Sequence, residues 1–287
     1  MVDMDSRTPH VERFFDPVTA TFSYVVSDPS SGVAAIIDPV LDYDPAVRKL
    51  ATHSAQCLLD YVLLQGLQVR WILETHAHAD HLSSAQWLKQ QLSSSPRVAI
   101  GNGIREVQQT FKQRLALEPD FATDGSQFDQ LLSDGDRLPL GGFEIEVIAT
   151  PGHTPDSVSY LIGDAIFVGD TVFAPYYGTA RCDFPGGDAR ELYASIQKIL
   201  ALPDSMRIFL CHDYPPPSQA PQHLSSPPEQ RDCNVHLKGG IDVEAFATMR
   251  RARDAKLSAP RLLEPSLRVN IRAGHVSDPL VSRDHWM

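Results

Sequence analysis

Four side chains of the types that bind metal ions lie within six residues of this sequence. They are His76, His78, Asp80 and His81, in the pattern His-x-His-x-Asp-His. Imidazole and carboxylate together are the usual ligand set for zinc and iron(II). Asp80 also fits as the N-cap of a following helix, but capping gives no reason for three histidines. The segment therefore predicts a metal site rather than a solvated polar loop.

Three further candidate ligands lie much later in the chain, each directly after a short apolar run. They are His153, Asp170 and His212. A single histidine or aspartate in a loop is more often a surface residue or a helix cap. Three of them at the ends of predicted strands fit one shared site at the edge of a sheet. As a set, they strengthen the prediction of a metal centre.

The elements that must position these side chains are alternating strands and helices. Alternation and β-branched residues predict strands, and apolar spacing near 3.6 predicts helices. The first half is predicted to contain strands at 21–26, 32–37, 69–74 and 97–100, and helices at 44–66, 82–92 and 104–117. The helix at 44–66 would be capped by Asp44, with Pro45 at its first position. The first metal-binding segment thus lies between a strand and a helix.

The second half repeats this order. Strands are predicted at 137–140, 143–149, 157–162, 165–168 and 207–211, and helices at 188–202 and 243–256. Residues 215–228 hold six prolines and are predicted to form a surface loop. Two halves of this kind favour a single α/β domain over 1–287, a four-layer sandwich with two facing sheets and helices outside.

Composition excludes several classes of protein. The chain of 287 residues is 43% hydrophobic and 21% charged, which excludes a wholly disordered or collagen-like chain. Its net charge of −11 disfavours nucleic acid and anionic membranes as partners. Four cysteines without a C-x-x-C pair indicate a reducing compartment. Because no signal-peptide or transmembrane run is found, we expect a cytoplasmic enzyme.

The order of the seven candidate ligands resembles the metallo-β-lactamase superfamily. The superfamily has an H-x-H-x-D-H motif, followed by a later His, a bridging Asp and a final His. The matching residues here are, in order, His76, His78, Asp80, His81, His153, Asp170 and His212. The resemblance covers about residues 20–275 and implies an αββα sandwich of two mixed sheets with the metal at the sheet edge. Membership alone leaves the reaction open, since hydrolases, oxidoreductases and nucleases share this scaffold.

Three shorter segments resemble the persulfide dioxygenases of that superfamily, in their bacterial β-lactamase-like branch. Residues 178–184 look like the family's G-x-x-R-x-D-F, residues 211–214 resemble A-H-D-Y, and residues 265–274 look like the family's C-terminal ending. The resemblance implies oxidation of glutathione persulfide by O2 to sulfite and glutathione. It also implies one iron(II) ligated by His76, His153 and Asp170, an open triad that leaves room for substrate and O2.

The same resemblance assigns further roles. His78, Asp80, His81 and His212 would surround the ligated iron and tune it as catalytic residues. Arg181 is the expected carboxylate-binding residue, although an internal salt bridge with Asp183 is equally open. Tyr214 would donate to the substrate or cover the site, and Arg272 is a further substrate-binding candidate.

Two features depart from the family pattern. The interval of 77 residues between His76 and His153 predicts an insertion near 97–133, which would roof the pocket or form an interface. Cys182 stands where threonine is usual, and it would exchange sulfur or, as we favour, fill space. A homodimer through the insertion or a C-terminal helix is compatible with the sequence.

The main alternative is a binuclear zinc thioesterase of the glyoxalase II type, which would use nearly the same ligands with one or two Zn(II) per chain. A metal-binding scaffold without turnover is disfavoured, because every ligand position holds a competent residue. A β-lactam substrate is disfavoured by the match at 178–184.

Overall fold

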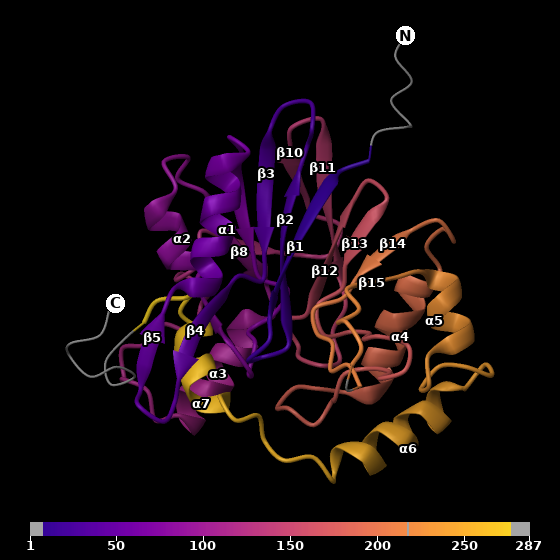
Figure 1. Cartoon of the computed structure of the whole chain (residues 1–287). Helices are drawn as coiled ribbons and strands as arrows, with labels where there is room; N and C mark the ends of the chain where they lie inside the picture. Colours follow the sequence, from indigo (N-terminus) through magenta and orange to yellow (C-terminus); the bar gives the residue numbers. More distant parts are fainter. Residues whose placement is uncertain (1–7, 217, 277–287) are drawn as a thin grey trace.

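Two six-stranded sheets face each other in this computed structural model, which describes residues 8–216 and 218–276 (Figure 1). The first sheet consists, in spatial order, of β1 (His10–Asp16), β2 (Thr21–Ser27), β3 (Val33–Ile37), β6 (Gln68–Leu73), β8 (Arg97–Gly101) and β9 (Gln130–Leu132). The second consists of β10 (Arg137–Leu140), β11 (Phe143–Ala149), β12 (Val158–Ile162), β13 (Ala165–Phe167), β14 (Arg207–Phe209) and β15 (Leu224–Ser225). Both sheets are mixed, because each contains parallel and antiparallel pairs.

Alternation along the strands sorts side chains between two cores. In β2, Phe22, Tyr24 and Val26 belong to the core between the sheets, whereas Val25 belongs to the core outside the first sheet. Successive residues of a strand point to opposite faces, so β2 serves both cores and is buried along its length. The sandwich follows from this two-sided burial.

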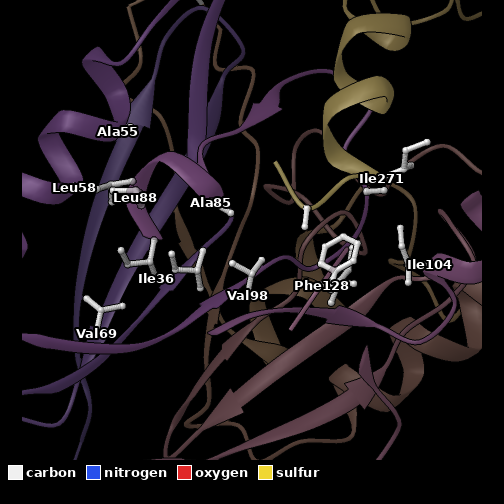
Figure 2. Close-up of a cluster of buried hydrophobic side chains, with 14 of the residues drawn as sticks. Ile36, Ala55, Leu58, Val69, Ala85, Leu88, Val98, Ile104, Phe128 and Ile271 are labelled. Atoms are coloured by element: carbon white, nitrogen blue, oxygen red, sulfur yellow. The ribbon is translucent and has the colours of Figure 1, made fainter. Parts of the chain in front are cut away.

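Helices cover the outer faces of both sheets (Figure 1). On the first sheet lie α1 (His53–Leu64), α2 (Ala85–Gln91) and α3 (Ile104–Arg114), joined by α7 (Leu263–Asn270) from the end of the chain. Figure 2 shows their shared core, in which Ile36 and Val98 of the sheet meet Leu58 and Leu88 of the helices. On the second sheet lie α4 (Ala189–Leu200) and α6 (Val243–Asp254), with α5 (Pro227–Cys233) beside α4. The predicted αββα sandwich is confirmed.

The predicted helix at 44–66 is wrong in its first part. β4 (Val40–Asp44) and β5 (Lys49–Ala51) form an antiparallel hairpin there, and with β7 (Leu82–Ser83) they make a small third sheet. Asp44 accepts from the backbone N–H of Ala46 within the turn instead of capping a helix. Leu50 packs in a separate small core with Leu41, Leu82, Leu262 and Val269. It is apolar for that reason, and not because it lies on the buried face of a helix.

The predicted proline-rich loop at 215–228 is also shorter than expected. Residues 224–225 form β15, and α5 begins at Pro227. The side chain of Ser226 caps α5 by accepting from the N–H of Glu229 at 3.4 Å. Proline at the first helical positions costs no hydrogen bond, so the prolines start this helix rather than prevent it.

The segment 97–133 supplies β8, α3 and β9 to the first half of the sandwich and none of the residues that line the pocket over the metal-binding side chains. It therefore does not roof that pocket. Residues 1–7, part of the stretch expected to lack a signal peptide, lie outside the described residues. Among the helices that the structure describes, none has the length and apolar character needed to cross a bilayer.

Candidate metal centre

The loop between β6 and β7 carries the four clustered ligands and is fixed by side chains from distant parts of the chain. Asp38, just after β3, accepts from the backbone N–H and the hydroxyl of Thr75 at 2.7 and 2.9 Å. Asp156 accepts from the N–H of Ala77 at 2.7 Å. Asn270, in α7, donates to the carbonyls of His78 and His81, both at 2.8 Å.

Sequence reasoning missed these three anchors. Asp38 follows an apolar strand in an Asp-Pro pair, a position that marked only a strand end. Asn270 was noted only as part of the C-terminal segment that resembles the family's ending. Asp156 gave no signal that a single sequence could reveal. The anchors satisfy backbone groups of a buried loop, which would otherwise be costly to bury.

The first group of candidate ligands consists of His76, His153 and Asp170. Their ligand atoms all lie within 4.8 Å of one another. His153 comes from the loop after β11 and Asp170 from the loop after β13, so the group forms at one end of the sandwich. The Nε2 atom of His153 lies 3.6 Å from Oδ2 of Asp170. The structure thus brings together the three residues expected to bind iron.

The second group consists of His78, Asp80, His81 and His212, again within 4.8 Å. Nε2 of His212 lies 3.4 Å from Oδ2 of Asp80 and 3.3 Å from Oδ1 of Asp170. Asp170 therefore lies between the two groups, with one oxygen toward each. In a third, fully buried group, Nε2 of His78 lies 3.0 Å from Oδ1 of Asp38 and Glu74 lies close by.

Hydrogen bonds at Nδ1 set the tautomers of these histidines. Carbonyl oxygens only accept, so Nδ1 of His153 donates to Arg181 at 2.7 Å and Nδ1 of His212 donates to Ala20 at 3.2 Å. The Thr75 hydroxyl already donates to Asp38 and therefore accepts from Nδ1 of His76. Each ring keeps Nε2 as its lone-pair nitrogen, the form in which histidine binds a metal.

Buried polar atoms without a hydrogen bond gather at the same place. Among the described residues, Nε2 of His81, Nε2 of His212 and Oδ1 of Asp170 have no hydrogen-bond partner. Such atoms are rare in folded proteins, because leaving one unsatisfied costs about 1–3 kcal/mol. All three are donors of electron pairs that face one another, which fits a site for a metal cation.

The electrostatics favour neutral His76 and His78 and an ionised Asp80, whereas Asp80 and Asp170 outweigh burial and raise the pKa of His212. Burial and the neighbouring histidines hold the pKa of His76 and of His78 well below the usual range. Burial raises the pKa of Asp80, but His212 and His81 outweigh it and the net shift is downward. Burial is also the main reason that the pKa of Asp170 is raised. A cation would offset the cost of burying the Asp170 charge.

A cavity of about 380 Å³ opens onto these ligands. Asp80, His153 and Asp170 form its floor. Its lining also includes four aromatic residues, Phe173, Tyr177, Phe184 and Tyr214, and four arginines, Arg181, Arg250, Arg253 and Arg261. Arg250 is buried, whereas Arg253 and Arg261 are exposed and form the rim. Its volume lies in the range of small-molecule sites.

Of the predicted substrate-binding residues, Arg181 and Tyr214 line this cavity. The guanidinium of Arg181, however, makes a bidentate salt bridge to Asp183, at 2.6 and 2.7 Å, and also donates to the carbonyl of Ser258 at 2.8 Å. The internal salt bridge considered as the alternative is therefore present. Tyr214 stacks on His212, with ring centroids 6.0 Å apart.

Arg272 does not line the cavity. It donates to both carboxylate oxygens of Glu118, at 2.8 and 2.9 Å, and lies over the ring of Phe121. These contacts tie the end of α7 to the segment after α3, so the expected substrate-binding role of Arg272 has no support in the structure.

The four cysteines are predicted to differ in reactivity. Cys57 and Cys233 are exposed, whereas Cys182 and Cys211 are buried. Burial raises the pKa of the Cys182 thiol to about 12, and the pKa of Cys211 is raised well above its usual value by burial and Asp38. Only thiolates react with alkylating agents. Iodoacetamide at pH 7.5, followed by mass spectrometry, should modify Cys57 and Cys233 within minutes and leave the other two intact until the protein is unfolded. Rapid native modification of Cys182 would contradict its space-filling role.

Curated relatives match along nearly the whole chain. The "Probable metallo-hydrolase" of Burkholderia pseudomallei is 49% identical, covering 94% of each chain. "Glyoxylase B2" of Dictyostelium discoideum is 45% identical, covering 94% of this chain and 93% of that protein. The mitochondrial "Persulfide dioxygenase ETHE1" of Homo sapiens is 30% identical, covering 92% of this chain and 88% of that protein.

Solved structures agree with the fold. The crystal structure of ETHE1 from Myxococcus xanthus superimposes with a TM-score of 0.73, at 26% identity, covering 93% of this chain and 100% of that one. The family model described as "Metallo-beta-lactamase superfamily" matches residues 16–212, from the end of β1 to the last of the candidate ligands. With its facing sheets and its ligands gathered at one end of them, the chain belongs to the metallo-beta-lactamase superfamily.

Proposed function

We propose that this protein is an iron-dependent persulfide dioxygenase that acts on glutathione persulfide or a related low-molecular-weight persulfide. In balanced form, R–S–SH, O₂ and H₂O give R–SH and H₂SO₃. The two persulfide sulfurs together lose four electrons and O₂ accepts them. Similarity to the human and Myxococcus xanthus proteins named ETHE1 supports this reaction.

The observation that carries the proposal is the make-up of the group His76, His153 and Asp170. Two histidines and one carboxylate with open positions are the ligand set of non-haem iron(II) oxygenases. His78 is not part of this group; its Nε2 lies 3.0 Å from Oδ1 of Asp38, and its ligand atoms group instead with Asp80, His81 and His212 or with Asp170, Cys211 and His212. A three-residue set leaves room for both a persulfide and O₂.

The protein residues would hold the reactants and control their surroundings. Iron(II), when bound by His76, His153 and Asp170, supplies the redox chemistry that lets O₂ react with a sulfur ligand. The carbonyl of Arg181 keeps the His153 ring oriented, and the carbonyl of Ala20 does so for His212. Phe173 and Phe184 line the cavity and limit the access of water.

A binuclear zinc thioesterase is the second candidate, because one observation favours it. His78, Asp80, His81 and His212 form a complete donor group beside Asp170, which could bridge two metal ions. Zinc accepts this ligand set, and two zinc ions would activate a water for hydrolysis. The relative named Glyoxylase B2 agrees with this alternative.

Metal analysis combined with O₂ consumption separates the two candidates. We expect protein purified without added metal to hold about one iron per chain, and to consume O₂ and release sulfite when given glutathione persulfide. Asp80→Ala should retain that iron, because Asp80 is outside the group of three. Two zinc ions per chain, loss of one of them in Asp80→Ala and hydrolysis of a glutathione thioester would instead establish the hydrolase.

A further inference from the structure

Four arginines line the cavity over the metal-binding residues, in an otherwise acidic chain. Two of them are neutralised within the protein. Arg181 pairs with Asp183, and Arg250 pairs with Asp254 one turn later in α6. Their charges are therefore balanced before any ligand binds.

The other two are Arg253 and Arg261, which are exposed. Arg253 lies in the last turn of α6, and Arg261 lies in the segment that leads to α7. Among the residues that the structure describes, neither has an ion-pair partner. They leave two uncompensated positive charges at the mouth of a cavity whose floor holds Asp80 and Asp170.

Arg253 and Tyr177 line the same cavity as the candidate ligand Asp170. Burial raises the pKa of Tyr177, the positive charges of Arg253 and Arg250 oppose that rise, and Asp170 adds to it. The charges of Asp170 and Arg253 thus both act on the Tyr177 hydroxyl. A ligand bound in this cavity would therefore lie in the field of both the metal-binding residues and Arg253.

Both arginines lie beyond residue 212, where the match to the superfamily model ends. The candidate metal ligands lie within the matched residues, whereas this part of the rim comes from α6 and from the segment between α6 and α7. Specificity is a difference between ligands, and it is decided by groups that contact the part of a ligand that varies. The rim is therefore where this chain would select its substrate.

We infer that Arg253 and Arg261 bind a carboxylate of the substrate, remote from its reacting sulfur. The inference rests on the proposed function for the sulfur chemistry alone. Guanidinium groups bind carboxylates through paired charge-assisted hydrogen bonds. The substrate class is then a persulfide of a carboxylate-bearing thiol, such as the peptide glutathione, rather than inorganic or uncharged persulfide. The guanidinium of Arg181 is already bound to Asp183, so Arg181 contributes instead through its backbone carbonyl, which positions the His153 ring.

The test compares Arg253→Gln, Arg261→Gln and the double variant with Arg251→Gln. Arg251 is a matched control, because it is exposed on the same helix but does not line the cavity. Each protein is assayed with glutathione persulfide and with cysteamine persulfide, which has no carboxylate. Binding of S-methylglutathione, which cannot turn over, is measured by calorimetry on the same preparations.

With glutathione persulfide, each single variant should raise KM by about tenfold, the lower end of what a charged hydrogen bond contributes, with kcat unchanged. KM for cysteamine persulfide and all values for Arg251→Gln should stay within about twofold of the parent. S-methylglutathione should bind correspondingly more weakly to the double variant.

Equal changes for both persulfides, or no change in KM and in S-methylglutathione affinity, would overturn the carboxylate site. If the protein consumes no O₂, the calorimetry still decides: arginine-dependent binding of S-methylglutathione upholds the site while the dioxygenase proposal fails. Absence of that binding in the parent protein rejects the site whatever the reaction is.

Discussion

Asp170→Ala will be purified without stoichiometric iron and will consume no O₂. Asp170 is the only carboxylate of the group with His76 and His153, and its other oxygen lies 3.3 Å from Nε2 of His212. Losing a residue that orients a ligand lowers metal affinity about 10–100-fold, so losing this direct ligand should exceed about 100-fold. Iron content by mass spectrometry and O₂ uptake provide the measurement.

The fold should survive this change. Burial raises the pKa of Asp170, so the carboxylate is costly in the metal-free protein and its removal should leave the unfolding midpoint in chelator equal or higher. Asp60→Ala, which removes an exposed carboxylate from α1, is the control and should keep its iron. A full complement of iron in Asp170→Ala would disprove its role as a ligand.

Asn270→Ala will destabilise the protein and weaken metal binding together. The Asn270 side chain makes three buried hydrogen bonds at 2.8 Å, to the carbonyls of His78 and His81 and from the N–H of Ser83. Each buried backbone group left unsatisfied costs about 1–3 kcal/mol, so the loss of three partners should lower the free energy of unfolding by roughly 3–9 kcal/mol. Denaturant unfolding in the presence of chelator measures this loss.

Freed from Asn270, the loop that carries His78, Asp80 and His81 should hold its ligands less firmly, and metal affinity should fall about 10–100-fold. Asn234→Ala is the matched control. Asn234 is equally buried and makes three hydrogen bonds, but to residues outside the metal-binding loop. It should lose stability and keep its metal affinity. Unchanged metal affinity in folded Asn270→Ala would limit Asn270 to a structural role.

Most strands of the sandwich could be predicted because their signals are local. The alternation of Phe22, Tyr24 and Val26 against Val25 is the physical cause of burial on two faces, and it is visible in the sequence. The hairpin of β4 and β5 was missed because its pairing, with Asp42 opposite Ala51, is set by packing of Leu50 against Leu262 and Val269. That packing joins segments more than 200 residues apart.

The sequence by itself determined the candidate ligands and their placement after strands, because residue type and strand ends are local properties. Only the tertiary structure decided which charged and polar side chains have a partner within the protein. Arg181 meets Ser258, Arg272 meets Glu118, and Asn270 meets His78. Each of these contacts spans a long stretch of chain, and a guanidinium or amide binds whichever partner the fold brings near. The same physics leaves Arg253 and Arg261 available at the rim of the cavity.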